Sequence, residues 1–334
     1  MRCNQQRSIE VMTKKIMKEG NVGNVNSHQP VPCFLCKSFN TVSFDYLRLN
    51  SDDFKRNLAY SLPKAVADSL CAISSRFASA YYPVAVNKKY FDRSAVYCKD
   101  CLTGSCQPGF EKELLANYYQ KFYWSNRDSI DGQHVALDDR PNDRQMGLTD
   151  DRIAWIDQFL PRVESVIDFG AGDCAAAFTY GKRAEVRTVH VVDPSVRAGA
   201  LAAKYGLGYS ENVEQAPIVD FVYSAHSIEH VPDLLKSIGE LLAHVRLGGH
   251  VFFETPNIGD LEVFAGLSHT PHTFMLSAQS FQFLASIFPI QIVGIDCCGP
   301  AWQKSKKQIR SDEKADLRVL LQKTGEICDM ECMK

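Results

Sequence analysis

Apolar residues follow a regular pattern in the second half of this chain of 334 residues. Short apolar runs alternate there with segments in which apolar residues recur every three or four positions. Such alternation of strands and helices is typical of a parallel sheet covered on both faces, so the sequence predicts an α/β fold. The expected strands are 165–168, 188–193, 219–224, 249–254 and 290–296, and the expected helices are 195–205, 233–245 and 277–288.

Two further elements are expected at the two ends of this region, a helix at its start and a strand at its end. A helix capped by Thr149 or Asp150 is expected to begin it, and Pro161 to end that helix, because proline cannot continue a helix. The last candidate strand, 317–322, has apolar residues at every second position. We expect it to be an antiparallel strand at the edge of the sheet.

The first half of the chain lacks this alternation and predicts a smaller, irregular N-terminal domain. Its first residues are polar, and a helix rich in aromatic residues leads into a charged linker or lid. The predicted division is 1–30 a loose tail, 31–110 the small domain, 111–148 the aromatic helix and linker, 149–325 the α/β domain, and 326–334 a C-terminal tail.

Composition and charge narrow the classes of function. Lys and Arg number 37 and Asp and Glu number 39, a balance that lacks the basic excess typical of nucleic-acid-binding proteins. No apolar run approaches the roughly 20 residues of a membrane-spanning helix, and no apolar stretch follows the basic N-terminus as in a secretory signal. We expect a cytoplasmic protein with a small-molecule partner, binding neither nucleic acid nor membrane; its oligomeric state stays open.

The strand at 165–168 runs directly into a turn that contains Gly170 and Gly172 and then into a helix. Small residues let the backbone approach a ligand closely, and the amides at a helix start attract an anionic group. The next strand ends in Asp193, at a position where nucleotide-binding folds hold ribose hydroxyls. The pattern therefore favours a cofactor that contains a nucleoside.

A dinucleotide is the first alternative, but its fingerprint has a third glycine, whereas Asp173 and Cys174 follow Gly172 here. The charge of Asp173 would repel a pyrophosphate. No Lys-Ser or Lys-Thr follows the turn, which argues against a loop that cradles the phosphates of ATP or GTP. A positively charged cofactor without phosphate suits this loop better.

Four segments together resemble class I S-adenosylmethionine-dependent methyltransferases, in the expected order across about residues 150–325. They read VIDFGAGD (166–173), VVDPS (191–195), SAHSIEHVPD (224–233) and LGGHVFFETPN (247–257). The resemblance implies a Rossmann-like, mostly parallel sheet and S-adenosylmethionine as cofactor. It also implies that the methionine part is lined by Asp168, Gly170 and Gly172, the ribose held by Asp193 beside Pro194, and the sulfonium side covered by the backbone of Ala225 and His226. Cys174 departs from the family pattern, because many members have a third glycine there.

The segment after the strand at 219–224 contains His226, Glu229 and His230. It follows the carboxyl end of a strand, the edge at which open parallel sheets bind ligands. Methyl transfer to a hydroxyl or an acidic carbon needs a base, and histidine titrates nearest neutrality. His226 is the first candidate for this base and His230 the second; the alternative is that these residues only support the cofactor pocket.

His269 and His272 form a second pair, which in related methyltransferases faces the acceptor. His272 is therefore a further candidate base. A divalent metal site with Glu229 is an alternative, because two imidazoles and a carboxylate are suitable ligands. Pro271 speaks against it, since it breaks any helix that would place both histidines on one face.

Two CxxC pairs, Cys33 with Cys36 and Cys98 with Cys101, lie in the N-terminal region. Four thiolates at this spacing predict a structural Zn²⁺ site; unliganded thiols are the alternative, and a misassigned ligand would be replaced by Cys71 or Cys106. The arrangement resembles the N-terminal zinc-binding part of methyltransferases that act on sugars and small metabolites. By that resemblance, an aromatic helix follows the second pair. Its aromatic residues lie on nearly every face, more than one buried stripe needs, so we expect Tyr119 and Tyr123, which share a face, to cover the cofactor or acceptor; the alternative is that the run forms helix core.

The leading hypothesis is therefore an S-adenosylmethionine-dependent methyltransferase that acts on a small acceptor such as a sugar or glycan precursor. A second hypothesis keeps the fold but makes the acceptor a quinone-like or other aromatic metabolite. A third hypothesis is a binding protein that is stabilised by a structural zinc ion and has an inactive methyltransferase fold. The sequence does not distinguish oxygen, nitrogen or carbon as the methylated atom.

Overall fold

The computed structural model of the chain describes most of the predicted α/β domain and two parts of the N-terminal region. Tyr123, Cys71 and His269 lie outside the described residues, as do the tail at 1–30 and residues 120–140 of the predicted linker. The described residues are 31–45, 93–119, 141, 143–160, 162–258, 272–298 and 316–327.

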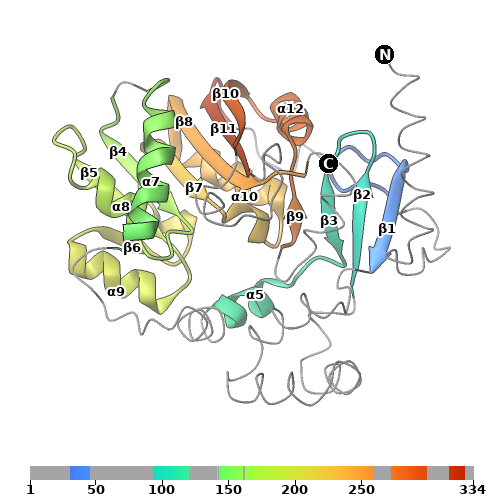
Figure 1. Cartoon of the computed structure of the whole chain (residues 1–334), viewed down its shortest axis with the longest axis horizontal. Coiled ribbons are helices and arrows are strands. Elements are labelled where there is room, and N and C mark those ends of the chain that lie inside the picture. Colours follow the sequence, from blue (N-terminus) through green and yellow to red (C-terminus); the bar gives the residue numbers. More distant parts are fainter. Residues whose placement is uncertain are drawn as a thin grey trace, which may run out of the picture.

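Within these residues, seven strands form one sheet in the order β10-β11-β8-β7-β4-β5-β6 (Figure 1). Strands β4 to β8 pair in parallel, and β11 runs antiparallel to both of its neighbours. The mostly parallel, Rossmann-like sheet with an antiparallel strand is thus confirmed. The strands are β4 Ser165–Phe169, β5 Thr188–Val192, β6 Gly208–Ser210, β7 Val219–Ala225, β8 Val245–Pro256, β10 Ile290–Cys298 and β11 Asp316–Lys323.

The predicted edge position of the last strand is wrong, because β10 lies outside β11. Nearly every residue of β11 is buried, whereas β10 exposes several of its residues. This burial follows from the position of β11 between β8 and β10. Its alternation of apolar residues indicates a strand but does not show which strands lie beside it.

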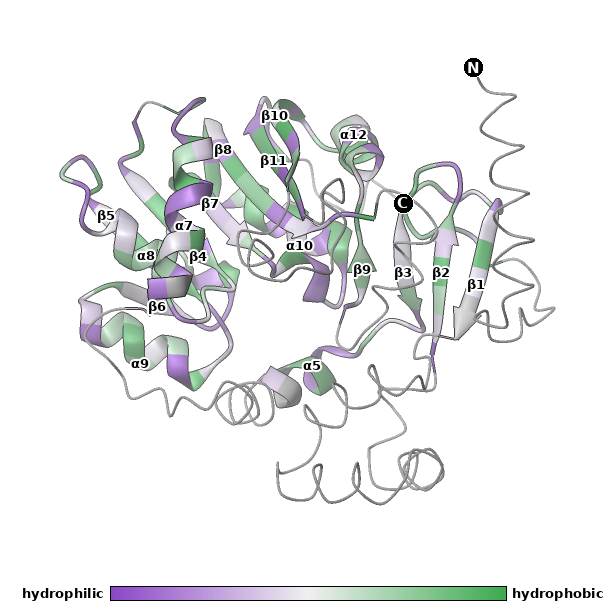
Figure 2. Ribbon diagram, in the orientation of Figure 1, coloured by the Kyte–Doolittle hydropathy of each residue, from purple (hydrophilic) through white to green (hydrophobic). Residues whose placement is uncertain are grey.

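Helices cover both faces of the sheet, and each face has its own hydrophobic core. Neighbouring side chains of one strand enter opposite cores: Val166 packs with α7, α8 and α9, and Ile167 packs with α10 and α12. In Figure 2, α7 and α9 carry both apolar and hydrophilic bands, as expected for helices with one buried side. None of the described helices is long and apolar enough to cross a membrane. Their bounds are α7 Asp143–Ile156, α8 Ala175–Tyr180, α9 Val196–Tyr205, α10 Leu234–Ala243 and α12 Ala278–Ile287.

Helix α7 begins at Asp143, so the predicted caps at Thr149 and Asp150 are wrong. Thr149 lies inside the helix with its side chain buried, and the acidic residue of the first turn is Asp143. The helix ends before Pro161, as expected. The misplaced start arises because Thr and Asp side chains signal a helix start only when the preceding residues are not helical.

The N-terminal region forms a second, antiparallel sheet of four strands in the order β1-β2-β3-β9. Its described part is therefore not irregular; its strands have only two to five residues each, too few for a clear pattern in the sequence. The fourth strand, β9, comes from the chain after β8, so the small sheet is completed by the α/β part. The strands are β1 Thr41–Asp45, β2 Ser94–Cys98, β3 Gly104–Gln107 and β9 Phe274–Met275, and helix α5, Lys112–Tyr118, follows β3.

Candidate functional site

The loop between β4 and α8 has a left-handed backbone at three positions. Gly170 has a φ of 69° and Gly172 a φ of 54°. A Cβ atom on Gly170 would lie 2.2 Å from Oγ of Ser227, and that hydroxyl donates a hydrogen bond to the carbonyl of Gly170 at 3.1 Å. Glycine is therefore required here both by the backbone conformation and by the close approach of the segment after β7.

Cys174 holds the third left-handed position, with a φ of 56°, where the family pattern often has glycine. Its side chain is fully buried, and Sγ lies 3.7 Å from the carbonyl oxygen of Ala198 in α9. Burial raises the pKa of the Cys174 thiol, which keeps it uncharged. A small side chain that packs between α8 and α9 is thus accepted at the cost of a strained backbone.

Two buried carboxylates lie at the carboxyl ends of β4 and β5 and are held by backbone amides. Asp168 accepts a hydrogen bond from the amide of Ala177 at 2.9 Å. Asp193 accepts from the amides of Gly172 at 2.9 Å and Ser195 at 2.8 Å. Burial raises the pKa of Asp168 to about 7 and also raises that of Asp193, whose hydrogen bonds act in the opposite direction. Because a carboxylate can accept about four hydrogen bonds, both retain acceptor capacity.

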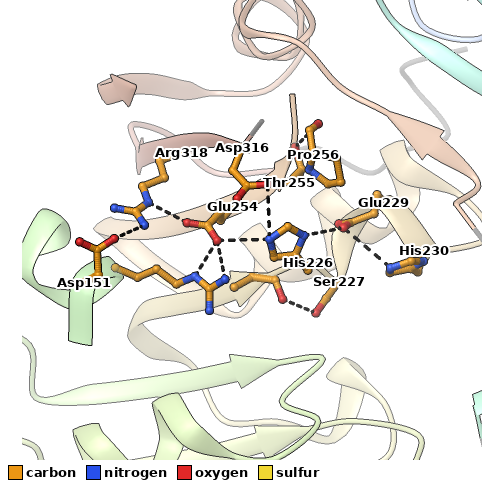
Figure 3. Close-up of polar contacts among 12 residues, drawn as sticks. Asp151, His226, Ser227, Glu229, His230, Glu254, Thr255, Pro256, Asp316 and Arg318 are labelled. Atoms are coloured by element: carbon orange, nitrogen blue, oxygen red, sulfur yellow. Dashed lines mark hydrogen bonds and ion pairs between the residues drawn. The ribbon is translucent and has the colours of Figure 1, made fainter. Parts of the chain in front are cut away.

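His226 lies directly after β7, also with a left-handed backbone (φ 52°). Its Nδ1 is 3.5 Å from Glu229, and its Nε2 is 3.3 Å from Glu254 and 3.7 Å from Asp316 (Figure 3). Burial alone would lower the pKa of His226, but the carboxylates of Glu229 and Glu254 outweigh it and raise the pKa to about 10. With 36% of its side chain exposed, His226 is a solvent-facing imidazole that carries charge at neutral pH.

Glu254 is itself clamped by two arginines from different elements. Arg152 of α7 donates through Nε to one carboxylate oxygen at 2.6 Å, and Arg318 of β11 donates to the other at 2.7 Å. Arg318 also binds Asp151 at 2.7 Å (Figure 3). The carboxylate of Glu254 is 2% exposed, and the charges of His226 and Arg152 overcome its desolvation and hold its pKa well below the usual range.

The sequence analysis did not identify Arg152, Glu254, Asp316 or Arg318. The sequence did contain a signal for Glu254 and Arg318. Each is a charged residue beside apolar residues of a strand, and the two face each other in the β8–β11 register. Buried charges of this kind occur almost only in pairs. Nothing in the sequence indicates that α7 supplies the second arginine.

A second group of side chains, which we call the His–Glu cluster, consists of Glu229, His230 and His272. Nε2 of His230 is 3.8 Å from Glu229, and the rings of His230 and His272 are centred 4.7 Å apart. The amide of Thr273 donates to the carbonyl of Glu229 at 2.9 Å, which ties the strand after β8 to the turn after β7. The predicted residues His226, Glu229, His230 and His272 are thus brought together.

The remaining predicted cofactor residues, Ala225, Pro194 and Tyr119, lie in three different parts of the site. Ala225 ends β7 beside Glu254, and Pro194 follows β5 on the exposed surface. Tyr119 lies against His230, with the ring centres 5.9 Å apart in an edge-to-face arrangement. Tyr119 therefore belongs to the surroundings of the His–Glu cluster, not to those of the glycine loop.

The four predicted zinc ligands converge. Sγ of Cys33 is 3.5 Å from that of Cys101, and Sγ of Cys36 is 3.5 Å from that of Cys98. All four sulfur atoms lie within 4.8 Å of one another. A tetrahedral Zn²⁺ with bonds of about 2.3 Å needs sulfur atoms about 3.8 Å apart, so this set fits the ion.

Both CxxC pairs are followed by a residue with an unusual backbone conformation. The residue after each pair has a left-handed backbone, with a φ of 61° at Lys37 and 51° at Leu102. Leu102 lies in the tight turn between β2 and β3, and Lys37 closes a turn through a hydrogen bond of its amide to the carbonyl of Cys33 at 3.0 Å. The two turns thus present their thiols to one point from opposite sides.

The cysteine group packs against the α/β part of the molecule. Thr103, two residues after Cys101, shares a hydrogen bond of 2.7 Å with Ser280 of α12. The amide of Cys106 in β3 donates to the carbonyl of Thr273 at 2.8 Å. Because Thr273 follows His272, the small sheet helps to fix the segment that carries one member of the His–Glu cluster.

Comparison with known proteins identifies the larger part of the chain. A family model described as a methyltransferase domain matches residues 143–325. No curated protein matches the sequence. Similar solved structures include a chain of the complex between the Haloferax volcanii Trm112 methyltransferase activator and a protein described as a methyltransferase, at 14% identity over 55% of this chain and 94% of the other, with a TM-score of 0.42.

Two further similar structures are the plantazolicin methyltransferase BpumL, solved with an analogue of desmethylated plantazolicin and SAH, and a protein of Listeria monocytogenes described as an S-adenosylmethionine-dependent methyltransferase. The first is 14% identical over 63% of this chain and 95% of the other, with a TM-score of 0.44. The second is 13% identical over 52% and 98%, with a TM-score of 0.41.

Proposed function

This chain belongs to the methyltransferase-domain family, and from that premise we propose that it transfers a methyl group from S-adenosylmethionine to a small hydroxylated acceptor. The observation that carries the proposal is the pair of buried carboxylates, Asp168 and Asp193, fixed by amides of the glycine loop and of the turn after β5. They give the cofactor side a rigid surface of hydrogen-bond acceptors. The imidazoles after β7 give the acceptor side its chemistry.

The cofactor is proposed to lie across the loop between β4 and α8. Asp168, Gly170 and Gly172 would line its methionine part, because the left-handed glycines leave the backbone open to close approach. Asp193, with its remaining acceptor positions, would bind the two ribose hydroxyls beside Pro194. Asp173 in the same loop is 3.5 Å from Arg197, so its charge is already paired.

The sulfonium methyl is proposed to point toward the turn after β7. Ser227 joins this turn to the glycine loop through its hydrogen bond to Gly170, so the backbone of Ala225 and His226 lies at the border of the two sites. Methyl transfer is a direct displacement and depends on the alignment of acceptor, methyl carbon and sulfur. The rigid turn supplies that alignment.

The acceptor proton is proposed to be removed at the His–Glu cluster and not by His226. Carboxylates lie 3.5 and 3.3 Å from the two ring nitrogens of His226, and their negative charges keep both nitrogens protonated. It then has no lone pair for a proton. His230 and His272, with Glu229 beside them, are proposed to activate the acceptor hydroxyl there.

A sugar or glycan precursor is the proposed acceptor. The side chains around the turn after β7 are imidazoles and carboxylates, which bind hydroxyl groups, and the buried carboxylate of Glu229 is at their centre. A quinone-like acceptor would need apolar walls to cover its ring. Tyr119 beside His230 offers one aromatic face on which a sugar ring can pack.

The four cysteines are proposed to hold a structural Zn²⁺. Convergence of four sulfur atoms, with Cys33, Cys98 and Cys101 buried, supports this assignment. The ion would hold the two turns together and thereby the sheet that includes β9. It would supply no step of the reaction, because four thiolates leave no open position for a substrate.

The test is release of S-adenosylhomocysteine by the full chain, purified with its metal, in a screen of acceptors that begins with nucleotide sugars. We expect release with at least one sugar-based acceptor. Release only with phenolic acceptors would overturn the sugar assignment. If the chain neither binds S-adenosylmethionine in calorimetry nor releases product, it is a binding protein with an inactive fold.

A further inference from the structure

Glu229 is a buried carboxylate whose charge is not met by hydrogen bonds. Its residue is 1% exposed, and neither carboxylate oxygen has a hydrogen-bond partner among the residues that the structure describes. The nearest imidazole nitrogens, those of His226 and His230, are 3.5 and 3.8 Å away, too far for strong hydrogen bonds. A buried ionised carboxylate without such bonds is costly, and the charge of His226, which Glu229 shares with Glu254, compensates it only in part.

The neighbours of Glu229 complete a set of metal ligands. Donor atoms of Glu229, His230 and His272 lie within 4.8 Å of one another. Two imidazoles and one carboxylate form a common set for divalent first-row metals such as Zn²⁺, Fe²⁺, Co²⁺ and Mn²⁺, and they leave coordination positions open. Bonds of about 2.0–2.2 Å require donor atoms about 3.0–3.5 Å apart, which small side-chain rotations reach.

We propose that the His–Glu cluster binds a divalent transition-metal ion, whose open positions take oxygen atoms of the acceptor. This inference rests on the proposed function and states how the cluster activates the acceptor: Glu229 and the two imidazoles hold a Lewis acid. His272 joins the site beside His230 and Glu229.

The chemistry balances without an oxidant or a reductant. A hydroxyl bound to the ion loses its proton to water more readily than a free hydroxyl. The resulting oxygen lone pair forms the new bond to the methyl carbon as the bond between that carbon and sulfur breaks. The bonding electrons return to sulfur, which leaves as neutral S-adenosylhomocysteine.

A neighbouring group, His226 with Glu254 and Asp316, has a similar composition but does not fit a metal. Both carboxylate oxygens of Glu254 already accept hydrogen bonds from the arginines of α7 and β11. A cation there would have to displace two guanidinium groups. Among the residues that the structure describes, Glu229 has no arginine partner, so its carboxylate is free of this competition.

The backbone holds the ligands from independent elements. Glu229 and His230 lie in a single helical turn, Ile228–His230, that directly follows β7. His272 precedes β9, and the hydrogen bond between Thr273 and the carbonyl of Glu229 fixes one segment against the other. The site is therefore assembled by the fold before any ligand binds.

The test is a titration of the metal-free, reduced full chain with Co²⁺, followed by absorption spectroscopy and metal analysis. We expect two equivalents. One shows the intense sulfur-to-metal absorption of a thiolate site, and the other shows only weak bands typical of nitrogen and oxygen ligands. His272→Ala should weaken the second equivalent at least tenfold and leave the first unchanged. His250→Gln, on β8 outside the cluster, should retain both.

Glu229→Gln is the second variant, because it keeps the side-chain volume if His272→Ala disturbs the fold. Binding of only the thiolate equivalent by the native chain would overturn the proposal, as would a second equivalent that survives both substitutions. The titration contains no cofactor. Loss of the metal site with intact methyl transfer would refute this inference alone, whereas a metal site without cofactor binding would refute the proposed function alone.

Discussion

The glycine loop and the His–Glu cluster lie on neighbouring strands, yet their carboxylates are held in opposite ways. Asp168 and Asp193 accept hydrogen bonds from backbone amides that lie within about twenty residues of them. Glu229 accepts none from the described residues and faces imidazoles instead. One region is stabilised by the local backbone, and the other depends on side chains brought from two distant parts of the chain.

This difference suits the two proposed tasks, cofactor binding at the loop and methyl transfer at the cluster. A cofactor used in every turnover is best bound by a fixed surface, and backbone amides cannot rotate away. Chemistry needs groups whose charge and ligands can change, and imidazoles beside a buried carboxylate provide this. We therefore expect substitutions in the loop to alter cofactor binding and stability, and substitutions in the cluster to alter turnover.

His230→Gln should have the largest effect. It removes one imidazole of the cluster, so kcat should fall by about 10²–10⁴, while the affinity for S-adenosylmethionine stays within twofold. The matched variant is His226→Gln, on the same turn, which should keep kcat within about tenfold because His226 is held by carboxylates on both nitrogens. Steady-state kinetics and calorimetry measure the two quantities. The reverse order of effects would return the role of base to His226.

Asp168→Asn should change the pH dependence of stability. The pKa of Asp168 is about 7 in the folded protein and about 4 in an unfolded chain. Above pH 4 the unfolded chain therefore ionises first, and this residue progressively destabilises the fold until about pH 7, where the effect levels off. Asparagine does not ionise, so the variant escapes this destabilisation. Between pH 4 and pH 7, the free energy of unfolding of the variant should therefore rise relative to that of the native chain, by about 4 kcal/mol at most.

Urea unfolding of the cofactor-free chain at several pH values between 4 and 8 measures this gain. Asp150→Asn, at an exposed position of α7, is the control and should show no such trend. A difference between Asp168→Asn and the native chain that stays constant with pH would contradict the burial of an uncharged Asp168.

Cys98→Ser should have the smallest effect on turnover and the clearest effect on metal content. Loss of one thiolate should release the proposed Zn²⁺ and loosen β9, which pairs with β3. Because His272 comes shortly before β9, kcat should then fall by about tenfold. Cofactor affinity should not change. Cys106→Ser is the control, because Cys106 is buried in β3 but is not one of the four clustered cysteines. Equal zinc in both variants would argue against the assigned ligands.

The same division explains what the sequence could predict. The strands, the glycine loop and Asp193 were predictable because each depends on periodicity or on residues close in sequence. The two CxxC pairs were predictable because their spacing is itself a ligand signature. The carboxylate clamp was not, because Arg152, Glu254 and Arg318 come from three distant elements and meet only when the sheet is assembled.

Two errors have the same origin. The two residues of β9 are too few to show a pattern, so their pairing with β3 gave no signal, and the small domain was expected to be irregular. The position of β11 inside the sheet depends on the pairing of whole strands, which alternation along one strand does not encode. The contact of His272 with His230 was likewise not predictable, because 42 positions separate the two residues in the sequence.

Calorimetric titration of S-adenosylmethionine into three proteins tests the central claim most directly. If the loop binds the cofactor and the cluster does not, Asp193→Ala should lose at least tenfold in affinity, because charge-assisted hydrogen bonds to the ribose contribute about 1.5–3 kcal/mol. His230→Gln should bind like the native chain. Unchanged affinity in a folded Asp193→Ala variant, or an equal loss in His230→Gln, would contradict the division of the site into a cofactor loop and a reactive cluster.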